Sequence, residues 1–335
     1  MRVSSAAVLA GALVILACGG ESTEPEPDGD TFDPAPFQTG LGHILSGTGT
    51  SQLAILREGS DEIAQHFEII MIAPLGGRSP AAGLSLSVQP FPEVLKGQTF
   101  EWDVTGDEYG LAAAAGPVAG ARFLVYQLSG DAYAEPLVDA GHIDLLDDGH
   151  GPANVARLVA EIAGESQGNF AAYSTGTLQA GTVGIDGFFG TGSARVEFDV
   201  DAVNTVTAAG TASSYTATFA VPGSDLTAAV AIDVDRGAVV TYTAGIDVAV
   251  PGSSLELDGE YDGTAFIGVV RVGGALRANV VKTGAAAPVI TAAGDAALTE
   301  PQRALLVRVV DLIDAPTAYL DELLPPFAFV LGLSP

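Results

Sequence analysis

The chain contains 335 residues, of which 48% are hydrophobic and only 16% are charged. Asp and Glu number 41 against 13 Lys and Arg, so the formal net charge at pH 7 is −28. The apolar content excludes a largely disordered chain. The negative charge argues against nucleic acid as a partner, because few basic side chains are available to neutralise phosphates.

The first seventeen residues have the pattern of a secretory signal. Arg2 precedes a small, apolar stretch that is shorter than the roughly 20 residues needed to span a bilayer. Cys18 follows, and it is the only cysteine of the chain. The rest of the chain therefore has no partner for a disulfide and no thiol nucleophile.

The four residues Ile15-Leu16-Ala17-Cys18 resemble the lipobox of bacterial lipoproteins. The resemblance implies that residues 1–17 are removed and that Cys18 carries the lipid. Gly19, where some lipoproteins of the inner membrane carry Asp, resembles sorting to the outer membrane. Residues 18–40 are rich in Asp, Glu and Pro, a composition that extends a chain and cannot form a core. We therefore predict an acidic tether between the lipid and the folded body.

Residues 41–298 are predicted to form a β-rich domain. In residues 193–203 the apolar side chains alternate strictly with polar ones, and the same period of two recurs in residues 215–221, 226–235, 240–250 and 255–262. Further strands are expected at 53–57, 62–72, 84–88, 99–104, 122–128 and 154–163, and a loop or short helix at 112–115. Asp148-Gly149, Asp262-Gly263 and Gly273-Gly274 suit tight hairpin turns.

The period changes near the end of the chain. Thr299 and Gln302 have the spacing of a helix capping box, and apolar residues then recur at helical spacing. Pro316 interrupts this stripe, and Asp314 could cap a second helix. We therefore predict a pair of helices in residues 299–333, packed on the sheet.

These elements predict a mainly β protein. Its body would be a large antiparallel meander, as a curled sheet, a sandwich or a partly closed barrel, covered by the C-terminal helical pair. A barrel of the outer membrane is the competing architecture, but aromatic residues make up only 7% of the chain. The predicted arrangement resembles β-rich bacterial envelope lipoproteins of unassigned function. In architecture alone it also resembles lipoprotein carriers built as half-barrels with helical lids.

The sequence favours a protein without catalytic activity or cofactor. It has no Gly-x-Ser-x-Gly nucleophile motif and no His-Glu-x-x-His motif, and it contains four His in total. The glycine-rich stretch 187–192 lacks the Lys of a phosphate-binding loop.

The densest polar cluster offers a candidate metal site. It consists of Asp144, Asp147, Asp148 and His150, whose carboxylate and imidazole groups could bind Ca²⁺ or Zn²⁺. The alternative is a hairpin turn flanked by solvated side chains, and we favour that alternative because the spacing matches no known calcium loop.

Two functional hypotheses follow. In the first, an amphiphile or other hydrophobic ligand binds between the sheet and the C-terminal helices, against Val309, Ile313, Leu320 and Leu323. In the second, the chain is a structural or adhesive surface module that uses the acidic, solvated face of the sheet, with or without Ca²⁺. The acidic residues expected on that face are Asp199, Asp201, Asp233, Asp235, Asp247, Glu256, Asp258, Glu260 and Asp262. Both place a lipid-anchored protein in the cell envelope, at the outer membrane. The sequence leaves its oligomeric state and the side of the membrane open.

Overall fold

The computed structural model describes residues 32–47, 91–106, 108–129, 132–150, 154–176, 180–207, 210–294, 297–324, 327 and 331. The predicted signal, Cys18, most of the predicted tether and the strands expected at 53–57, 62–72 and 84–88 lie outside these residues. None of the described helices combines the length and the apolar run that crossing a membrane requires.

The described chain is built mainly of strands, as predicted. The strands are β1 (Gln98–Asp103), β2 (Glu108–Ala115), β3 (Gly120–Tyr126), β4 (Leu128–Ser129), β5 (Ala132–Tyr133), β6 (Asp139–His150), β7 (Asn154–Ile162), β8 (Glu165–Gly176), β9 (Gly181–Phe189), β10 (Val196–Thr207), β11 (Gly210–Val221), β12 (Leu226–Arg236), β13 (Val240–Val250), β14 (Ser253–Tyr261), β15 (Phe266–Val272), β16 (Ala275–Lys282) and β17 (Val289–Ala292). The helices are α2 (Ala35–Gly47), α4 (Glu300–Asp311) and α5 (Ala315–Leu323), with short 3-10 turns η3 (Glu93–Leu95), η4 (Gly192–Ala194), η5 (Pro222–Ser224) and η6 (Leu312–Asp314).

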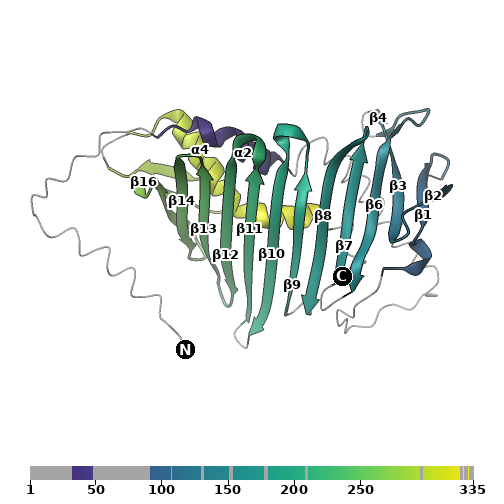
Figure 1. Ribbon diagram of the computed structural model, residues 1–335. Helices are drawn as coiled ribbons and strands as arrows, with labels where there is room; N and C mark the ends of the chain where they lie inside the picture. The colour runs from purple at the N-terminus through teal and green to yellow at the C-terminus, as the bar shows by residue number, and fades with distance from the viewer. Residues whose placement is uncertain are drawn as a thin grey trace, which may run out of the picture. The chain divides into compact units, whose positions relative to one another are not determined.

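Fifteen strands form one mixed sheet, in the order β17-β16-β15-β14-β13-β12-β11-β10-β9-β8-β7-β6-β3-β1-β2 (Figure 1). From β6 to β17 each strand pairs antiparallel with the next strand of the chain, and among the described strands only β1 and β3 pair in parallel. β2 and β17 end the order, so the sheet is not closed. The predicted alternatives of a sandwich or a partly closed barrel are not confirmed, because helices instead of a second sheet cover the apolar face.

Short connections set the register of this meander. Val272 pairs with Ala275 around the two-residue turn Gly273-Gly274, whose φ angles of 55° and 82° favour glycine. Asp262-Gly263 also lies in a turn, between β14 and β15. Asp148-Gly149 does not: both residues belong to β6, where the pairing with β7 is irregular. This predicted turn is therefore wrong.

Residues 112–115, predicted as a loop or short helix, belong to strand β2. Alanine favours helices when it is isolated, but pairing with β1 outweighs that preference here. Residues 154–163 were ambiguous between helix and strand, and the strand predicted there is observed as β7.

The C-terminal helical pair is not confirmed. Helix α4, the turn η6 and helix α5 follow one another without a break from Glu300 to Leu323. The N–H of Ala315 donates to the carbonyl of Leu312 in a 3-10 bond. In a regular α-helix this carbonyl would accept from the N–H of residue 316, which proline does not have. Because Ala315 donates to it instead, Pro316 leaves no carbonyl without a donor there, and the helix continues past the proline. The predicted capping box of Thr299 and Gln302 is present.

Helix α2 was not predicted, and it begins at Ala35, inside the segment assigned to the tether. Phe37, Leu41 and Ile44 recur on one side of the helix and are each 0% exposed. The helix lies beside α4 and against η5 and β10–β13. Its packing makes residues 35–47 part of the folded body.

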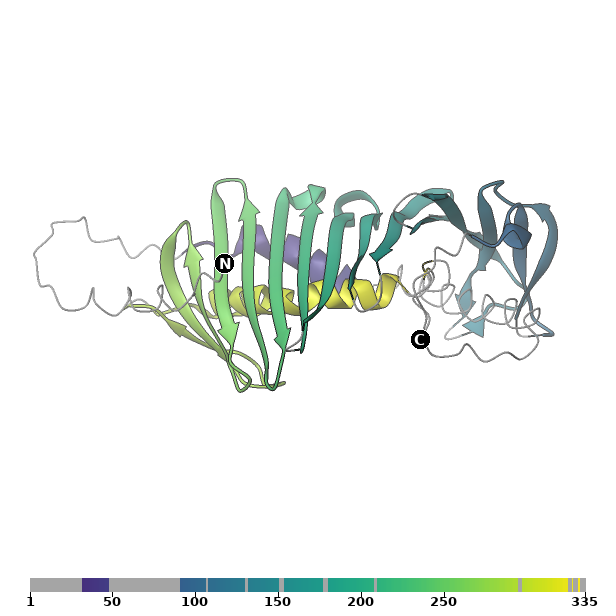
Figure 2. The same ribbon diagram turned by 90° about the horizontal axis from the view of Figure 1, so that it is seen from below.

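The three helices cover one face of the sheet, which we call the inner face (Figures 1 and 2). Tyr319 of α5 lies at the centre of this layer, and its ring contacts those of Phe189, Phe198 and Phe219. The Tyr319 hydroxyl donates to the carbonyl oxygen of Ile44 at 3.1 Å, which ties α5 to α2. The opposite face of the sheet, which carries Asp199 and its neighbours, is called the outer face.

Candidate functional site

The four residues of the predicted metal site lie on or at the end of β6, but protein cations bind their carboxylates separately. Asp144 accepts two hydrogen bonds from Arg122, at 2.7 and 2.8 Å. Asp147 lies 2.9 Å from Nζ of Lys96, and Asp148 lies 2.7 Å from Nε of Arg157.

The last residue of that prediction, His150, pairs in register with Asn154. The described parts of the chain contain no group of three or more His, Cys, Asp or Glu side chains arranged to hold a metal ion. The geometry of β6 therefore gives the metal hypothesis no support beyond the sequence pattern.

The residues predicted to contact a hydrophobic ligand are packed in the core. Val309, Ile313, Leu320 and Leu323 are between 0% and 7% exposed. Two pockets are described on the molecule, and none of these four residues lines either of them. Both pockets have most of their lining on the outer face, away from the helices.

The larger pocket, about 690 Å³, lies over β9–β13. Its lining includes four carboxylates, contributed by Asp186, Glu197, Asp199 and Asp247, together with the hydroxyls of Thr218 and Thr227. Strand pairing explains this gathering, because directly paired residues share a face of the sheet. Asp186 pairs with Asp199 across β9 and β10, which places two like charges side by side.

Asp199 is the carboxylate whose protonation this crowding changes. Partial burial, and then the charges of Asp201 and Asp186, raise the pKa of Asp199 above its ordinary value of 3.8. The environment thus resists the accumulation of negative charge at the Asp186–Asp199 pair. A positively charged group placed there would relieve this repulsion.

Basic side chains lie at the borders of this acidic region. At one border, Arg195 lies over the ring of Phe188, with 3.7 Å between the guanidinium carbon and the ring centroid, and pairs with Glu197 at 2.8 Å. At the opposite border, Arg271 of β15 pairs with Asp258 at 2.7 Å. Between them, Asp199, Asp233, Asp235 and Asp247 have no ion pair within the described residues.

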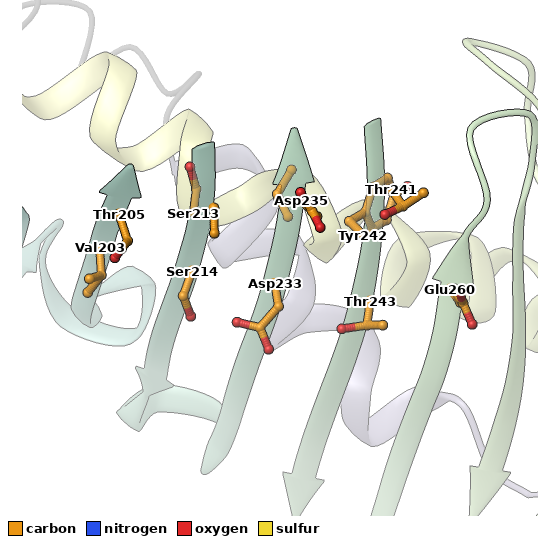
Figure 3. Close-up of a pocket in the computed structure, with 12 residues that line it drawn as sticks. Val203, Thr205, Ser213, Ser214, Asp233, Asp235, Thr241, Tyr242, Thr243 and Glu260 are labelled. Atoms are coloured by element: carbon orange, nitrogen blue, oxygen red, sulfur yellow. The ribbon is translucent and has the colours of Figure 1, made fainter. Parts of the chain in front are cut away.

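The second pocket, about 350 Å³, lies over β10–β14 toward the other end of the strands (Figure 3). Its lining includes a row that crosses four adjacent strands. Ser214 pairs with Asp233, Asp233 with Thr243, and Thr243 with Glu260. Hydroxyl and carboxylate groups therefore alternate along the row, and the strand spacing places successive carboxylates about 9.6 Å apart.

Sequence reasoning identified the acidic residues of β10, β12, β13 and β14 as solvated, but it missed Asp186 and Tyr173. The Tyr173 hydroxyl donates a hydrogen bond to Oδ1 of Asp201. Burial, followed by that bond and the nearby carboxylates, raises the pKa of Tyr173 above its ordinary range. No local motif marks either residue, because their place on the face depends on pairing between strands.

Comparison with protein families, with curated proteins and with solved structures finds no match to this chain. The assignment of a function therefore depends on the geometry and charge of the outer face and on the sequence pattern of the amino terminus.

Proposed function

We propose that this chain is a lipid-anchored protein of the bacterial cell envelope that binds a positively charged protein segment on the outer face of its sheet. In this proposal it is a binding module without catalytic activity. The proposal develops the second hypothesis from the sequence, a surface module that uses the acidic face.

One observation carries the proposal: the carboxylates of β9–β14 lie in register on a face that no described helix or strand covers, over two shallow pockets. Thr and Ser side chains separate them and supply further hydrogen-bonding groups. Such a face attracts a basic partner over a distance and selects against acidic ones. Lys and Arg side chains can reach carboxylates in open pockets of this kind without requiring a deep cavity.

The amphiphile hypothesis has weaker support. It requires space between the sheet and α4–α5, yet Val309, Leu320 and Tyr319 are almost completely buried against other side chains. A ligand there would have to displace packed aromatic rings around Tyr319, which is costly in a close-packed interior. We therefore prefer the outer face as the binding surface.

The proposed anchor explains how the face would be presented. Lipid on Cys18 would hold the chain at the membrane, and residues 19–34 would span at most about 50 Å before helix α2 begins. The acidic outer face would be repelled by anionic headgroups and would point away from the membrane surface. The outer membrane is the proposed location, on the basis of Gly19.

A binding assay tests the proposed surface. The full chain is titrated into a fluorescent twelve-residue lysine peptide, and anisotropy is recorded across a series of salt concentrations. We expect saturable binding that weakens as salt rises. The double variant Asp199→Asn/Asp247→Asn should weaken binding by about three- to tenfold. The matched control Glu300→Gln/Asp321→Asn changes two exposed carboxylates on the helices and should bind like the unmodified chain.

Two outcomes would contradict the proposal: no saturable binding at low salt, or equal losses for both double variants. Addition of millimolar Ca²⁺ tests the calcium-dependent form of the hypothesis, because such a module should gain thermal stability with Ca²⁺ and lose it with a chelator.

The lipid anchor is tested separately, by incorporation of labelled palmitate into the expressed chain. Label that persists after Cys18→Ser would contradict lipidation at that residue.

A further inference from the structure

The row of residues in the second pocket continues beyond β14. Glu260 ends its acidic part (Figure 3) and pairs with Ile267 of β15. Ile267 in turn pairs with Val281 of β16, and Val281 pairs with Val289 of β17. Directly paired residues share a face of the sheet, so these three side chains lie on the outer face. They are 59%, 39% and 64% exposed, and we call them the aliphatic row.

The composition of the outer face changes at the aliphatic row. On β11–β14 the residues of this face are Ala, Gly, Ser, Thr, Asp and Glu, with no larger aliphatic side chain among them. Strands favour β-branched residues, but Thr meets that preference on β11–β14. Strand preference therefore does not explain the change to Ile and Val. Isolated exposed aliphatic residues are ordinary, whereas these three adjoin across neighbouring strands and form one patch.

The charge of the outer face changes at the same place. The residues that β15, β16 and β17 contribute to it are uncharged except for Arg271, which pairs with Asp258 of β14 at 2.7 Å. The carboxylates thus end at β14, and the aliphatic row begins on the next strand. A segment bound across this border would meet an acidic surface with one part and an apolar surface with the other.

The two surfaces are close enough for one short segment to cover both. Asp233 of β12 and Val289 of β17 are five strand spacings apart, which corresponds to about 24 Å. An extended chain covers that distance with about eight residues. The carboxylates attract basic side chains over a distance, and the aliphatic row rewards contacts that remove apolar surface from water.

We propose that the partner segment has two parts: Lys or Arg residues that bind the carboxylates of β12–β14, and neighbouring aliphatic residues that pack on Ile267, Val281 and Val289. This inference rests on the proposed function, because it names the chemistry of the partner for the same face. The aliphatic part adds selectivity, since any basic polymer is attracted to an acidic face but few also cover the row. An anionic membrane surface is a poorer occupant, because it repels the adjacent carboxylates.

Two fluorescent twelve-residue peptides separate the two parts. Both begin with six lysines. One continues with six residues that alternate Leu and Ser, and the other continues with six serines, so that charge and length match. The full chain carrying Cys18→Ser, which removes the proposed lipid site, is titrated into each peptide. We expect the leucine peptide to bind about three- to tenfold more tightly than the serine peptide. This ratio should persist as salt rises, because salt screens charges and not apolar contacts.

A pair of matched double variants locates the leucine contact. Ile267→Thr/Val281→Thr removes apolar surface but keeps β-branched residues in both strands. It should bring the affinity ratio of the two peptides close to one and leave the affinity for the serine peptide unchanged. Val94→Thr/Val118→Thr makes the same kind of change at positions that are 66% and 90% exposed and lie outside β14–β17, and it should keep the ratio of the parent. Urea unfolding checks that both variants are folded.

The outcomes distinguish this inference from the proposed function. Saturable binding of both peptides with equal affinity would overturn the two-part segment and leave the acidic surface as the binding site. A ratio that Ile267→Thr/Val281→Thr does not change, or that both double variants reduce alike, would also overturn it. No saturable binding of either peptide would contradict the proposed function and the inference together. Finally, sedimentation velocity without peptide could show a dimer that Ile267→Thr/Val281→Thr abolishes, which would assign the row to a second copy and overturn the proposal.

Discussion

Tyr173 on β8 donates a hydrogen bond to Asp201 on β10, across the whole width of the intervening strand β9. Gly184 makes this possible, because it pairs with both residues and lies beneath the contact. A Cβ at Gly184 would overlap Oδ1 of Asp201 and the ring of Tyr173. The absence of a side chain at Gly184 on β9 thus allows side chains of the two flanking strands, β8 and β10, to contact one another.

Gly184→Ala should therefore destabilise the fold. The new methyl group must displace the Tyr173 ring, which we expect to cost about 1–3 kcal/mol in the free energy of unfolding. Gly245→Ala is the matched control, because it lies on the same face with only Asp258 near its Cβ, at 3.9 Å. Its effect should stay within about 0.5 kcal/mol. Urea unfolding of both variants checks this, and equal effects would contradict the described contact.

The pH dependence of stability should reveal the crowding at Asp199. Its pKa is raised in the folded state, so the folded chain holds this proton more tightly than the unfolded chain. The protonated Asp199 carboxyl therefore contributes to folding stability at low pH. This contribution is lost as the pH rises from the ordinary pKa of 3.8 through the raised pKa of the folded state.

Asp199→Asn should consequently stabilise the protein at pH 7, by about a few tenths of a kcal/mol after allowance for solvent screening. This gain in stability should vanish near pH 3, where position 199 is uncharged in the parent protein as well as in the variant. Thermal melts at both pH values measure it, with Asp321→Asn as the control for the loss of one exposed charge. A variant less stable than the parent at pH 7 would show that Asp199 is held by an attractive partner instead.

Helix α2 should contribute to the stability of the whole body. Phe37 is completely buried, and its replacement in Phe37→Ala should cost about 3–5 kcal/mol. Thr39→Ala changes an exposed residue of the same helix and should have little effect. Denaturant unfolding followed by far-ultraviolet circular dichroism compares the two. If Phe37→Ala left the main transition unchanged, α2 would be an independent segment rather than part of the core.

The strand pattern could be predicted well from β10 onward, for a physical reason. One face of β10–β14 is covered by helices and the other faces solvent, so apolar and acidic residues alternate with period two. Local sequence patterns did not predict helix α2. Its apolar residues Phe37, Leu41 and Ile44 follow an acidic, proline-rich segment, and the composition of that segment obscured their helical spacing.

The candidate site was predictable only in part. Asp199, Asp233 and Asp247 were correctly placed on a polar face, since alternation alone decides the face. Which carboxylates become neighbours depends on the register between strands, and that register follows from turns such as Gly273-Gly274 and η5. Pairing of this kind brings Asp186 beside Asp199 and Tyr173 near Asp201. The pairing of β3 with β6 likewise brings Arg122 to Asp144, which the sequence had assigned to a metal site.

The buried position of Leu320 separates the two functional hypotheses. If the helices complete the core, Leu320→Ala should lower stability by about 2–5 kcal/mol. Native mass spectrometry of the full chain, after incubation with envelope lipids, should then show no bound lipid between sheet and helices. A bound mass of several hundred daltons that Leu320→Ala abolishes without unfolding the protein would favour the amphiphile hypothesis.

Carbodiimide cross-linking of the full chain to the lysine peptide tests the central claim most directly, because it joins amines only to the carboxylates that they touch. Peptide mapping should place the cross-links on the outer face of β10–β14, at Asp199, Asp233, Asp247 and Glu260. Addition of salt should suppress them. Cross-links concentrated on Glu300 and Asp321 of the helices, or spread over all exposed carboxylates alike, would contradict the assignment of the outer face as the binding surface.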